Sequence, residues 1–370
     1  MGPLELACLV RVVGHIDVDY FFAQVEEVLN PALRTRPVVV CVYSGRSQSS
    51  GVVSTANYLA RSFGVSSGMS ISAAQKRLSG TNAEFIPMKQ EKYKLFSERV
   101  MQIVREHVDT LEQTGIDEAF FDITRFCDED YGSARITAVG IKNRIRQAEG
   151  LTVSIGIGKT KSVAKIASAF TKPDGLTIVE PSKTIDFLSP LSVTKLYGVG
   201  PKTASLLESI GIRTIGELAT SNIDDITRLL GRKLASRLHD AANGADDEPV
   251  VESQKVAQFS RIITLRKDAS SVEEAYSELL PAVKELAARM DSEGYAYRTL
   301  TVIGILSNLS VRTKSRSFET PVSSPFVLSE QTLALLSELF KSVQAEFRRV
   351  GVRVSDLVDI KDQASLNQYL

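Results

Sequence analysis

Three acidic residues lie where two predicted strands end, and they constrain the fold more than any other feature of the chain. Asp17 follows an apolar strand that we predict from Val10 onward, and the adjacent pair Asp117 and Glu118 interrupts a second apolar run. If these strands are neighbours, three carboxylates converge at one edge of a sheet. Such charge needs cations, and hard oxygen ligands suit Mg²⁺ or Mn²⁺. The alternative is that Asp17 or Asp19 caps a helix while the other two residues lie in a turn.

Composition sets modest bounds on the class of protein. A length of 370 residues predicts two to three domains. Basic and acidic residues balance at 44 each, so any surface for nucleic acid must come from segregation of charge. The three cysteines form no CxxC pair, which argues against a zinc site or a disulfide framework. No apolar run approaches the roughly 18 residues of a membrane span, and we expect a soluble intracellular protein.

Local patterns divide the chain into regions. Strand and helix patterns alternate up to about residue 175, and short helical segments follow to about residue 240. The polar stretch 243–249 contains Gly and Pro and is typical of a linker. From about residue 258 to residue 358 the predicted order is strand, helix, strand, strand, helix, strand. That order is a split βαβ arrangement.

A glycine-rich stretch at 156–160 is similar to a phosphate-binding loop but lacks its full pattern. The Walker motif needs an earlier glycine, separated from the Gly-Lys pair by four residues, and Val153 occupies that position. We therefore reject a P-loop. What remains is a helix start with Lys159, Lys161 and, one turn later, Lys165. These lysines could form the edge of an anion pocket or could simply be solvated.

A second glycine motif predicts a helix-hairpin-helix module. Gly198 and Gly200 flank a valine, Pro201 follows at a helix start, and Lys202 comes next. Glycines allow backbone N–H groups to approach a phosphate closely, and the helix N-terminus adds its dipole. Such contacts position the backbone of a nucleic acid without reading its sequence. The alternative is an ordinary Gly-Pro turn between helices.

The C-terminal region shows the charge segregation that the net charge hides. The helix predicted over residues 270–293 carries six acidic residues against two basic ones. We therefore expect a sheet with one basic face and acidic helices behind it, which would bind a duplex backbone in a salt-dependent way. The alternative is a solvated surface without a partner. The basic residues of the predicted strands are Arg261, Arg266, Lys267, Arg312, Lys314 and Arg316.

Five runs of sequence, taken in order, resemble the motifs of the Y-family DNA polymerases, and within them the archaeal DNA polymerase IV group. The resemblance covers nearly all of the 370 residues. The sequence departs from the family pattern at Gly115, where many relatives have Ser. Gly115 lies beside Asp117 and Glu118 and could change the rigidity of the local backbone. The five runs are DVDYFFAQVE at 17–26, STANYLAR at 54–61, IDEA at 116–119, GKTKSVAKIA at 158–167 and KPDG at 172–175.

The resemblance implies roles for particular residues. Asp17, Asp117 and Glu118 would be the catalytic metal ligands, together with the backbone of Val18, and two Mg²⁺ ions would be the cofactor, with Mn²⁺ as a substitute. Phe22 would be the steric gate that excludes a ribose 2′-hydroxyl. The positions that would hold the incoming dNTP are Phe22, Thr55, Tyr58, Arg61 and Lys165. Those that would contact DNA are Gly198, Gly200, Lys202, Arg261, Arg266, Arg312, Lys314 and Arg316.

The implied fold is an α+β multidomain right hand. Its parts are a palm with a split βαβ sheet, small fingers, a helical thumb with the helix-hairpin-helix, and a βαββαβ little finger. The expected boundaries are palm at 1–20 and 88–175, fingers at 21–87, thumb at 176–241, linker at 242–254, little finger at 255–358 and tail at 359–370.

The implied activity is template-directed addition of dNTPs to a primer 3′-hydroxyl, with low fidelity, translesion synthesis and no proofreading. Two other classes remain as alternatives. A palm-type nucleotide cyclase would not need the hairpin or the basic sheet, and a non-catalytic DNA-binding partner of a sliding clamp would not need the carboxylates. We expect a monomer in a prokaryotic cytoplasm, associated with the nucleoid when bound to DNA and with no membrane contact.

The last eight residues predict one further partner. They fit the pattern of a sliding-clamp peptide, in which an aliphatic and an aromatic side chain form a plug and a glutamine is held by hydrogen bonds. A frayed tail is the alternative. The residues that would bind the clamp are Gln363, Leu366, Tyr369 and Leu370.

Overall fold

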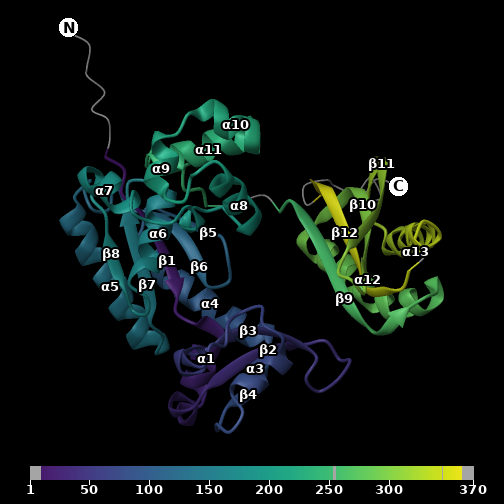
Figure 1. Ribbon diagram of the computed structural model, residues 1–370. Coiled ribbons are helices and arrows are strands. Elements are labelled where there is room, and N and C mark those ends of the chain that lie inside the picture. Colours follow the sequence, from purple (N-terminus) through teal and green to yellow (C-terminus); the bar gives the residue numbers. More distant parts are fainter. Residues whose placement is uncertain (1–9, 253–255, 344, 361–370) are drawn as a thin grey trace, which may run out of the picture. The chain divides into compact units, whose positions relative to one another are not determined.

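The computed structural model describes residues 10–252, 256–343 and 345–360 (Figure 1). By internal contacts the chain forms two units. The boundaries predicted for palm, fingers, thumb and little finger are finer than this division and stay predictions. The first unit spans residues 1–41, 53–67 and 76–254, and the second spans residues 42–52, 68–75 and 255–370.

A five-stranded sheet in the first unit carries the candidate carboxylates. Its strand order is β5-β6-β1-β7-β8, so β1 is central. Strand β1 is antiparallel to both β6 and β7, and β8 runs parallel to β7. The strands are β1 (Val13–Val18), β5 (Thr110–Gln113), β6 (Glu118–Asp122), β7 (Val153–Gly158) and β8 (Leu176–Ile178). The helices that pack on them are α4 (Gln90–Arg105), α5 (Tyr131–Glu149) and α6 (Lys161–Phe170).

The two faces of this sheet differ in character. Ile16 and its cross-strand partners Ala119 and Ile155 are buried in the apolar core that α4 and α5 share. Successive residues of a strand point to opposite faces, so His15 and Asp17 lie on the other face, beneath α6. The five-stranded sheet therefore presents its polar residues to one helix.

Gly156 allows α6 to lie directly on this polar face. It is the cross-strand partner of His15 on β7. A Cβ atom at position 156 would lie only 2.1 Å from the backbone nitrogen of Ser168 and 2.2 Å from the carbonyl oxygen of Ala164. The glycines of the motif at 156–160 thus serve helix-on-sheet packing, which agrees with the rejection of a P-loop.

A smaller sheet and short helices follow β1 in the sequence. The sheet has the order β3-β2-β4, and β2 pairs with β4 in parallel. Tyr20 adopts a left-handed φ of 36° between β1 and α1, where the chain turns from strand to helix. The elements are α1 (Phe21–Leu29), η1 (Pro31–Thr35), β2 (Val38–Tyr43), β3 (Gly51–Ala56), α2 (Tyr58–Ser62), α3 (Ile71–Arg77) and β4 (Glu84–Pro87).

Short helices between β8 and the linker share an apolar core with α6, and this core includes Val199, Leu207 and Leu218. Gly198 has a φ of 88°, and Gly200 is the N-cap of the helix that Pro201 begins. This is the predicted helix-hairpin-helix geometry. The elements are η2 (Pro181–Lys183), α7 (Thr184–Leu188), η3 (Val193–Lys195), α8 (Pro201–Ser209), α9 (Ile215–Thr220), α10 (Ile223–Leu230) and α11 (Arg232–Ala242).

The C-terminal domain has the predicted βαββαβ order. Its four-stranded sheet runs β11-β10-β12-β9, all neighbours being antiparallel, and two helices share one apolar core with it. None of the described helices is both long and apolar enough to cross a membrane. The elements are β9 (Gln258–Ala269), α12 (Val272–Glu293), β10 (Tyr295–Leu306), β11 (Val311–Val322), α13 (Pro325–Lys341) and β12 (Phe347–Asp359).

Candidate active site and DNA-binding surface

The two carboxylate-bearing strands are neighbours, as the sequence predicted. Asp17 on β1 is the cross-strand partner of Glu118 on β6. Asp117 precedes β6, and its carbonyl oxygen accepts the backbone N–H of Val18 at 2.9 Å. The antiparallel ladder therefore brings three acidic residues from distant parts of the sequence to one end of the sheet.

Lysine side chains neutralise two of these carboxylates. Glu118 Oε2 lies 2.5 Å from Lys165 Nζ and 3.4 Å from His15 Nε2. The adjacent Lys165 ammonium holds the pKa of Glu118 below its ordinary value. Asp17 forms an ion pair with Lys172. The Glu118 carboxylate therefore stays ionised and attracts positive charge.

Asp117 has the opposite electrostatic character. Burial, and then the nearby charge of Asp17, raise the pKa of Asp117 to about 6. Two adjacent acidic residues thus differ in pKa because one faces an ammonium group and the other is buried beside a second carboxylate.

The donor set suits a hard divalent cation, although the carboxylates are not gathered around one point. Within the described ranges, no group of three or more His, Cys, Asp or Glu side chains is arranged to hold a metal ion. Two of the carboxylates are instead ion-paired, Glu118 with Lys165 and Asp17 with Lys172. All three groups offer oxygen ligands, the kind that Mg²⁺ prefers. Each lysine supplies the positive charge that a cation would supply.

A cavity of about 210 Å³ opens beside Asp17 and Asp117. The Arg61 guanidinium lies 5.0 Å from the centre of the Tyr58 ring, and Arg61 Nε donates to the carbonyl of Ala56 at 2.8 Å. An oriented guanidinium beside two carboxylates could receive a phosphate group bridged by cations. Among the residues that line the cavity are Asp17, Val18, Phe22, Thr55, Tyr58, Arg61 and Asp117.

Phe22 has features of both a core residue and a gate residue. Its ring centre lies 4.6 Å from that of Tyr93, and its side chain packs against the apolar core. It is only partly buried, and it also lines the cavity. The turn at Tyr20 places its ring at the carboxylate end of β1, so the predicted gate role remains a prediction that the geometry allows.

Lys165 lies apart from the other predicted nucleotide contacts. Together with Glu118 it lines a second cavity, of about 180 Å³, which also borders Lys161, Tyr197 and Arg237. Thr55, Tyr58 and Arg61 do not line this second cavity. The structure thus distributes the predicted site residues over two neighbouring cavities, and Glu118 and Lys165 share one of them.

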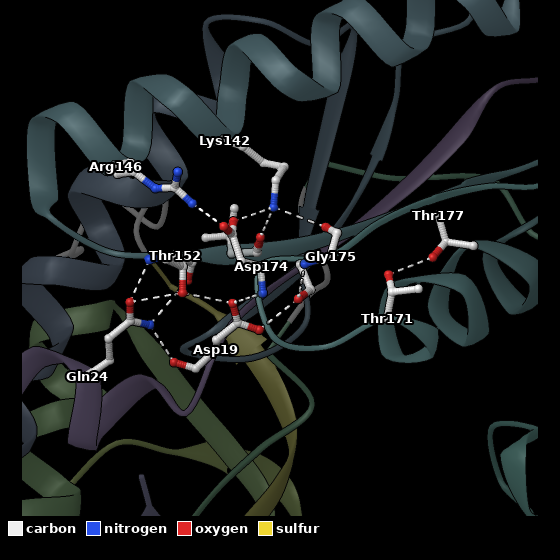
Figure 2. Close-up of polar contacts among 11 residues, drawn as sticks. Asp19, Gln24, Lys142, Arg146, Thr152, Thr171, Asp174, Gly175 and Thr177 are labelled. Atoms are coloured by element: carbon white, nitrogen blue, oxygen red, sulfur yellow. Dashed lines mark hydrogen bonds and ion pairs between the residues drawn. The ribbon is translucent and has the colours of Figure 1, made fainter. Parts of the chain in front are cut away.

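Asp19, which the sequence left open as a helix cap, is instead a fully buried structural residue. Its carboxylate accepts hydrogen bonds from Ser154 Oγ at 2.7 Å, Thr152 Oγ1 at 2.9 Å and the backbone N–H of Asp174 at 2.8 Å. Figure 2 shows the contacts with Thr152 and Asp174. These bonds tie the end of β1 to the turn that follows α6. Lys172 belongs to that turn, which explains how it reaches Asp17.

A second set of contacts in Figure 2 fixes the same turn from the other side. Lys142 Nζ lies 2.8 Å from Asp174 Oδ1, and Arg146 pairs with the other carboxylate oxygen. Burial alone would raise the pKa of Asp174, but these two cations hold it below its ordinary value. The KPDG run therefore has a clear structural role, which the sequence did not indicate.

The basic residues of the C-terminal domain do not form the sheet face that the sequence predicted. The register pairs Lys314 with Val302 and Arg316 with Leu300. Leu300 and Val302 are buried in the core shared with α12 and α13. Directly opposite residues share a face, so these two residues and Arg312, in step with them, lie on the helix side. The expectation of a basic sheet face with the helices behind it is wrong.

Several of these residues bond with acidic residues of the helices. Arg261 forms an ion pair with Glu285 of α12, and Arg316 Nη2 lies 2.6 Å from Glu338 of α13. The backbone N–H of Arg266 donates to Glu278 at 3.0 Å. Their assignment as DNA contacts stays a prediction. Any contact that they make with DNA would come from the edge strands β9 and β11.

The opposite face of this sheet carries two arginines that the sequence reasoning missed. Arg353 pairs across the sheet with Thr301 and Ser260, and Arg349 precedes it on the same strand, β12, and on the same face. Arg349 is exposed and Arg353 is half-buried. The sequence pattern could have shown this position, because both arginines alternate with the valines at 350, 352 and 354, which are buried.

The remaining predicted contacts are those of the hairpin with DNA and of the C-terminal peptide with a sliding clamp. Lys202 is exposed on α8, next to the hairpin of Gly198 and Gly200. The predicted clamp-binding peptide, with Gln363, Leu366, Tyr369 and Leu370, lies outside the described residues. A Cβ at Gly115 would lie 3.0 Å from Glu118 Cγ and 3.4 Å from Asp117 Oδ1, so this position borders the carboxylates closely.

Comparison with known proteins identifies the family. Residues 16–169 match the impB/mucB/samB family, residues 256–368 match the C-terminal domain of that family, and residues 191–243 match a SAM-like helix-hairpin-helix tandem. DNA polymerase IV of Methanosarcina acetivorans is 42% identical over 365 residues, which cover 97% of this chain and 99% of that protein. DNA polymerase IV of Nitrosopumilus maritimus is 38% identical over 97% of this chain and 99% of its own length.

Solved structures give the same result. A Y-family DNA polymerase chimera of Dbh and Dpo4 has a TM-score of 0.87 and 33% identity, over 94% of this chain and 99% of that chain. An insertion ternary complex of Dbh DNA polymerase has a TM-score of 0.69 and also 33% identity, over 94% and 99% of the two chains.

Fold and site together define a DNA-directed DNA polymerase. More specifically, the chain belongs to the Y family of DNA polymerases, with a helix-hairpin-helix domain and a little-finger domain. Its relatives mark it as a low-fidelity, translesion polymerase of the DNA polymerase IV kind, and enzymes of this family depend on metal ions. Neither a nucleotide cyclase nor a non-catalytic clamp partner is favoured by these matches.

Proposed function

We propose that this polymerase extends a primer 3′-hydroxyl by two-metal-ion phosphoryl transfer at the palm carboxylates. The observation that carries the proposal is the pairing of Asp17 with Glu118 across β1 and β6, with Asp117 adjacent. Two Mg²⁺ ions, or Mn²⁺ in their place, would be held by these three side chains and the carbonyl of Val18. When bound, such ions lower the pKa of the attacking hydroxyl and neutralise charge on the leaving pyrophosphate.

The protein's own residues orient the nucleotide. Thr55, Tyr58 and Arg61 line the cavity next to Asp17 and would hold the triphosphate, and the fixed guanidinium would stabilise charge that develops on it. Lys165 would contribute from the adjoining cavity once Glu118 binds a cation. Phe22 would occupy the space that a ribose 2′-hydroxyl needs.

The remaining parts would hold the primer-template. Backbone N–H groups of the hairpin at Gly198 and Gly200 would contact phosphates, and Lys202 would add charge. The little finger would contribute through its basic residues, and Arg349 and Arg353 add to that set from the face away from the helices. We propose that the enzyme acts as a monomer on nucleoid DNA in the cytoplasm, without proofreading, and that residues 363–370 bind a sliding clamp.

Single-nucleotide primer extension tests the catalytic assignment. Asp17→Ala should lower the rate at saturating DNA by about 100-fold or more, which corresponds to about 2.7 kcal/mol in the barrier, while the Kd for primer-template stays within about twofold of wild type. Glu98→Ala, which removes an exposed carboxylate from the palm helix α4, is the matched control and should be fully active. Extension by Asp17→Ala at more than a few per cent of the wild-type rate would reject the assignment.

A further inference from the structure

His15 is a buried histidine that the proposed mechanism does not yet use. Its side chain is 1% exposed, and it lies on β1, opposite Gly156 and beneath α6. Its ring centre lies 4.7 Å from that of Phe120, with the two rings edge to face. Buried ring nitrogens require hydrogen-bond partners. The contacts of the two nitrogens therefore indicate what the ring does.

The contacts of Ser168 fix the protonated nitrogen of the ring. Ser168 Oγ donates its single proton to the carbonyl oxygen of Lys165 at 2.9 Å. His15 Nδ1 lies 2.7 Å from the same Oγ. Because the hydroxyl proton is already used, the hydroxyl oxygen accepts, and Nδ1 carries the ring proton.

The other ring nitrogen then has a free lone pair. Lys165 Nζ lies 3.2 Å from His15 Nε2, and a lysine ammonium can only donate. Nε2 therefore accepts a hydrogen bond from Lys165. The 3.4 Å separation between Nε2 and Glu118 Oε2 is longer than the 2.5 Å contact between Glu118 and Lys165. The ammonium is thus shared between a carboxylate and a neutral acceptor.

We propose that His15 is a positioning residue for Lys165, which it keeps at the active site when Glu118 exchanges the lysine for a metal ion. The inference rests on the proposed function, in which Lys165 binds the triphosphate. A cation at Glu118 would repel the ammonium, whereas the neutral acceptor at His15 remains. Without it, a flexible four-carbon side chain would have to be ordered each time a nucleotide binds.

The aromatic neighbours of Lys165 cannot replace His15 in this role. The ammonium lies 5.7 Å from the ring centre of Phe120 and 5.9 Å from that of Tyr197. Such cation–π contacts attract the charge but fix its position less closely than a hydrogen bond does. His15 supplies the direction, and the rings supply a favourable environment.

Steady-state kinetics with a double-mutant cycle tests the proposal. His15→Phe keeps an aromatic ring and removes the acceptor, so it should raise KM for the dNTP about tenfold, the size expected for one hydrogen bond to a charged group, with a smaller change in kcat. Lys165→Ala should raise the same KM. The double variant should be no worse than Lys165→Ala, because both substitutions remove one interaction.

Conservative variants separate positioning from packing. His15→Gln offers an amide oxygen near the place of Nε2 and should recover most of the KM. Ser168→Ala leaves the ring intact but frees its tautomer, and it should raise KM in the same direction by a smaller factor. His107→Phe is the matched control, since His107 lies at the end of α4 and bonds to the carbonyl of Ile103; its KM should equal that of wild type. Thermal unfolding of each variant identifies any that fail to fold.

The outcomes separate the role of His15 from that of Lys165. An unchanged KM in Lys165→Ala would reject the proposed role of that lysine in nucleotide binding. If KM rises in Lys165→Ala but the losses are additive in the double variant, the positioning role of His15 is overturned while the role of Lys165 stands. The same conclusion follows if KM rises in Lys165→Ala but in neither His15→Phe nor Ser168→Ala. If His15→Phe does not fold, an unaltered KM in Ser168→Ala overturns the positioning role equally.

Discussion

The palm sheet and the little-finger sheet are both layers of helix on sheet, but they place their charged residues differently. In the palm, His15, Asp17 and Glu118 lie on the face that α6 covers. In the little finger, the face shared with α12 and α13 has an apolar core, and its basic residues lie at the edge strands or on the opposite face. The same architecture therefore holds charges in part-buried pairs in one domain, and in exposed pairs or at the free surface in the other.

This difference predicts how each region responds to substitution. A part-buried carboxylate that faces a lysine has a strongly shifted pKa, as Glu118 does, and its loss should affect chemistry. Exposed ion pairs such as Arg261 with Glu285 contribute little to stability, so these arginines can exchange partners and bind phosphates. We expect palm substitutions to lower the rate and little-finger substitutions to weaken binding.

The largest expected effect is at Glu118. Glu118→Ala should reduce the single-turnover rate by at least about 100-fold at saturating DNA, because it removes both a cation ligand and the partner of Lys165. Primer-template affinity should stay near that of wild type in a fluorescence titration. If Glu118→Ala instead lost affinity for primer-template and kept its rate, the expectation that palm substitutions lower the rate rather than weaken binding would be contradicted.

Phe22→Ala should give the next largest effect, and it concerns selection of the sugar. Removing the ring would open space beside the carboxylates, so incorporation of ribonucleotides relative to deoxyribonucleotides should rise at least about tenfold, or about 1.4 kcal/mol in discrimination. Deoxyribonucleotide addition should largely survive. The measurement is kcat/KM for dCTP and rCTP opposite guanine, and an unchanged ratio would leave Phe22 as a core residue alone.

Two sets of substitutions in the little finger compare the two faces of its sheet. Arg349→Ala with Arg353→Ala, and the triple change of Arg312, Lys314 and Arg316 to Ala, should each weaken DNA binding and flatten its salt dependence. Each lost phosphate contact should lower the logarithmic slope by about 0.9. The single-turnover rate at saturating DNA should hardly change. A set that leaves the slope unaltered consists of solvated or ion-paired residues that do not contact phosphate.

The smallest effect on basal activity is expected at the C-terminus. Removing residues 363–370 should leave synthesis without a clamp unchanged, because the predicted peptide follows the last strand of the little finger. Stimulation by a sliding clamp should be lost. Equal stimulation of the full-length and shortened chains would place the clamp contact elsewhere.

Much of the architecture followed from local sequence patterns. The helix start predicted at Lys161 is the first residue of α6 in the structure, and the βαββαβ order of the little finger is confirmed. These features depend on periodicity and on capping residues such as Thr160, which accepts the N–H of Val163. The convergence of Asp17 and Glu118 required only that two apolar strands be neighbours.

The features that sequence reasoning missed depend on contacts between distant residues or on strand register. Lys172 reaches Asp17 through a turn fixed by Asp19 and Asp174, and no local pattern predicts that network. The prediction placed Lys314 and Arg316 on the wrong face of the sheet for a different reason. It overlooked that both residues alternate in step with Phe318, which packs on the core. Attention to that alternation would have placed them correctly.

Binding of Mn²⁺, followed by electron paramagnetic resonance, tests the central claim most directly. The sample is the complex with a dideoxy-terminated primer, template and the next dNTP, in which chemistry cannot proceed. The proposed two-metal site predicts that Asp17→Ala loses Mn²⁺ affinity at least about tenfold, while the Arg349→Ala and Arg353→Ala double variant, saturated with DNA, binds Mn²⁺ as wild type does. Equal Mn²⁺ binding by Asp17→Ala and wild type would contradict the claim that the palm carboxylates hold the catalytic metal ions.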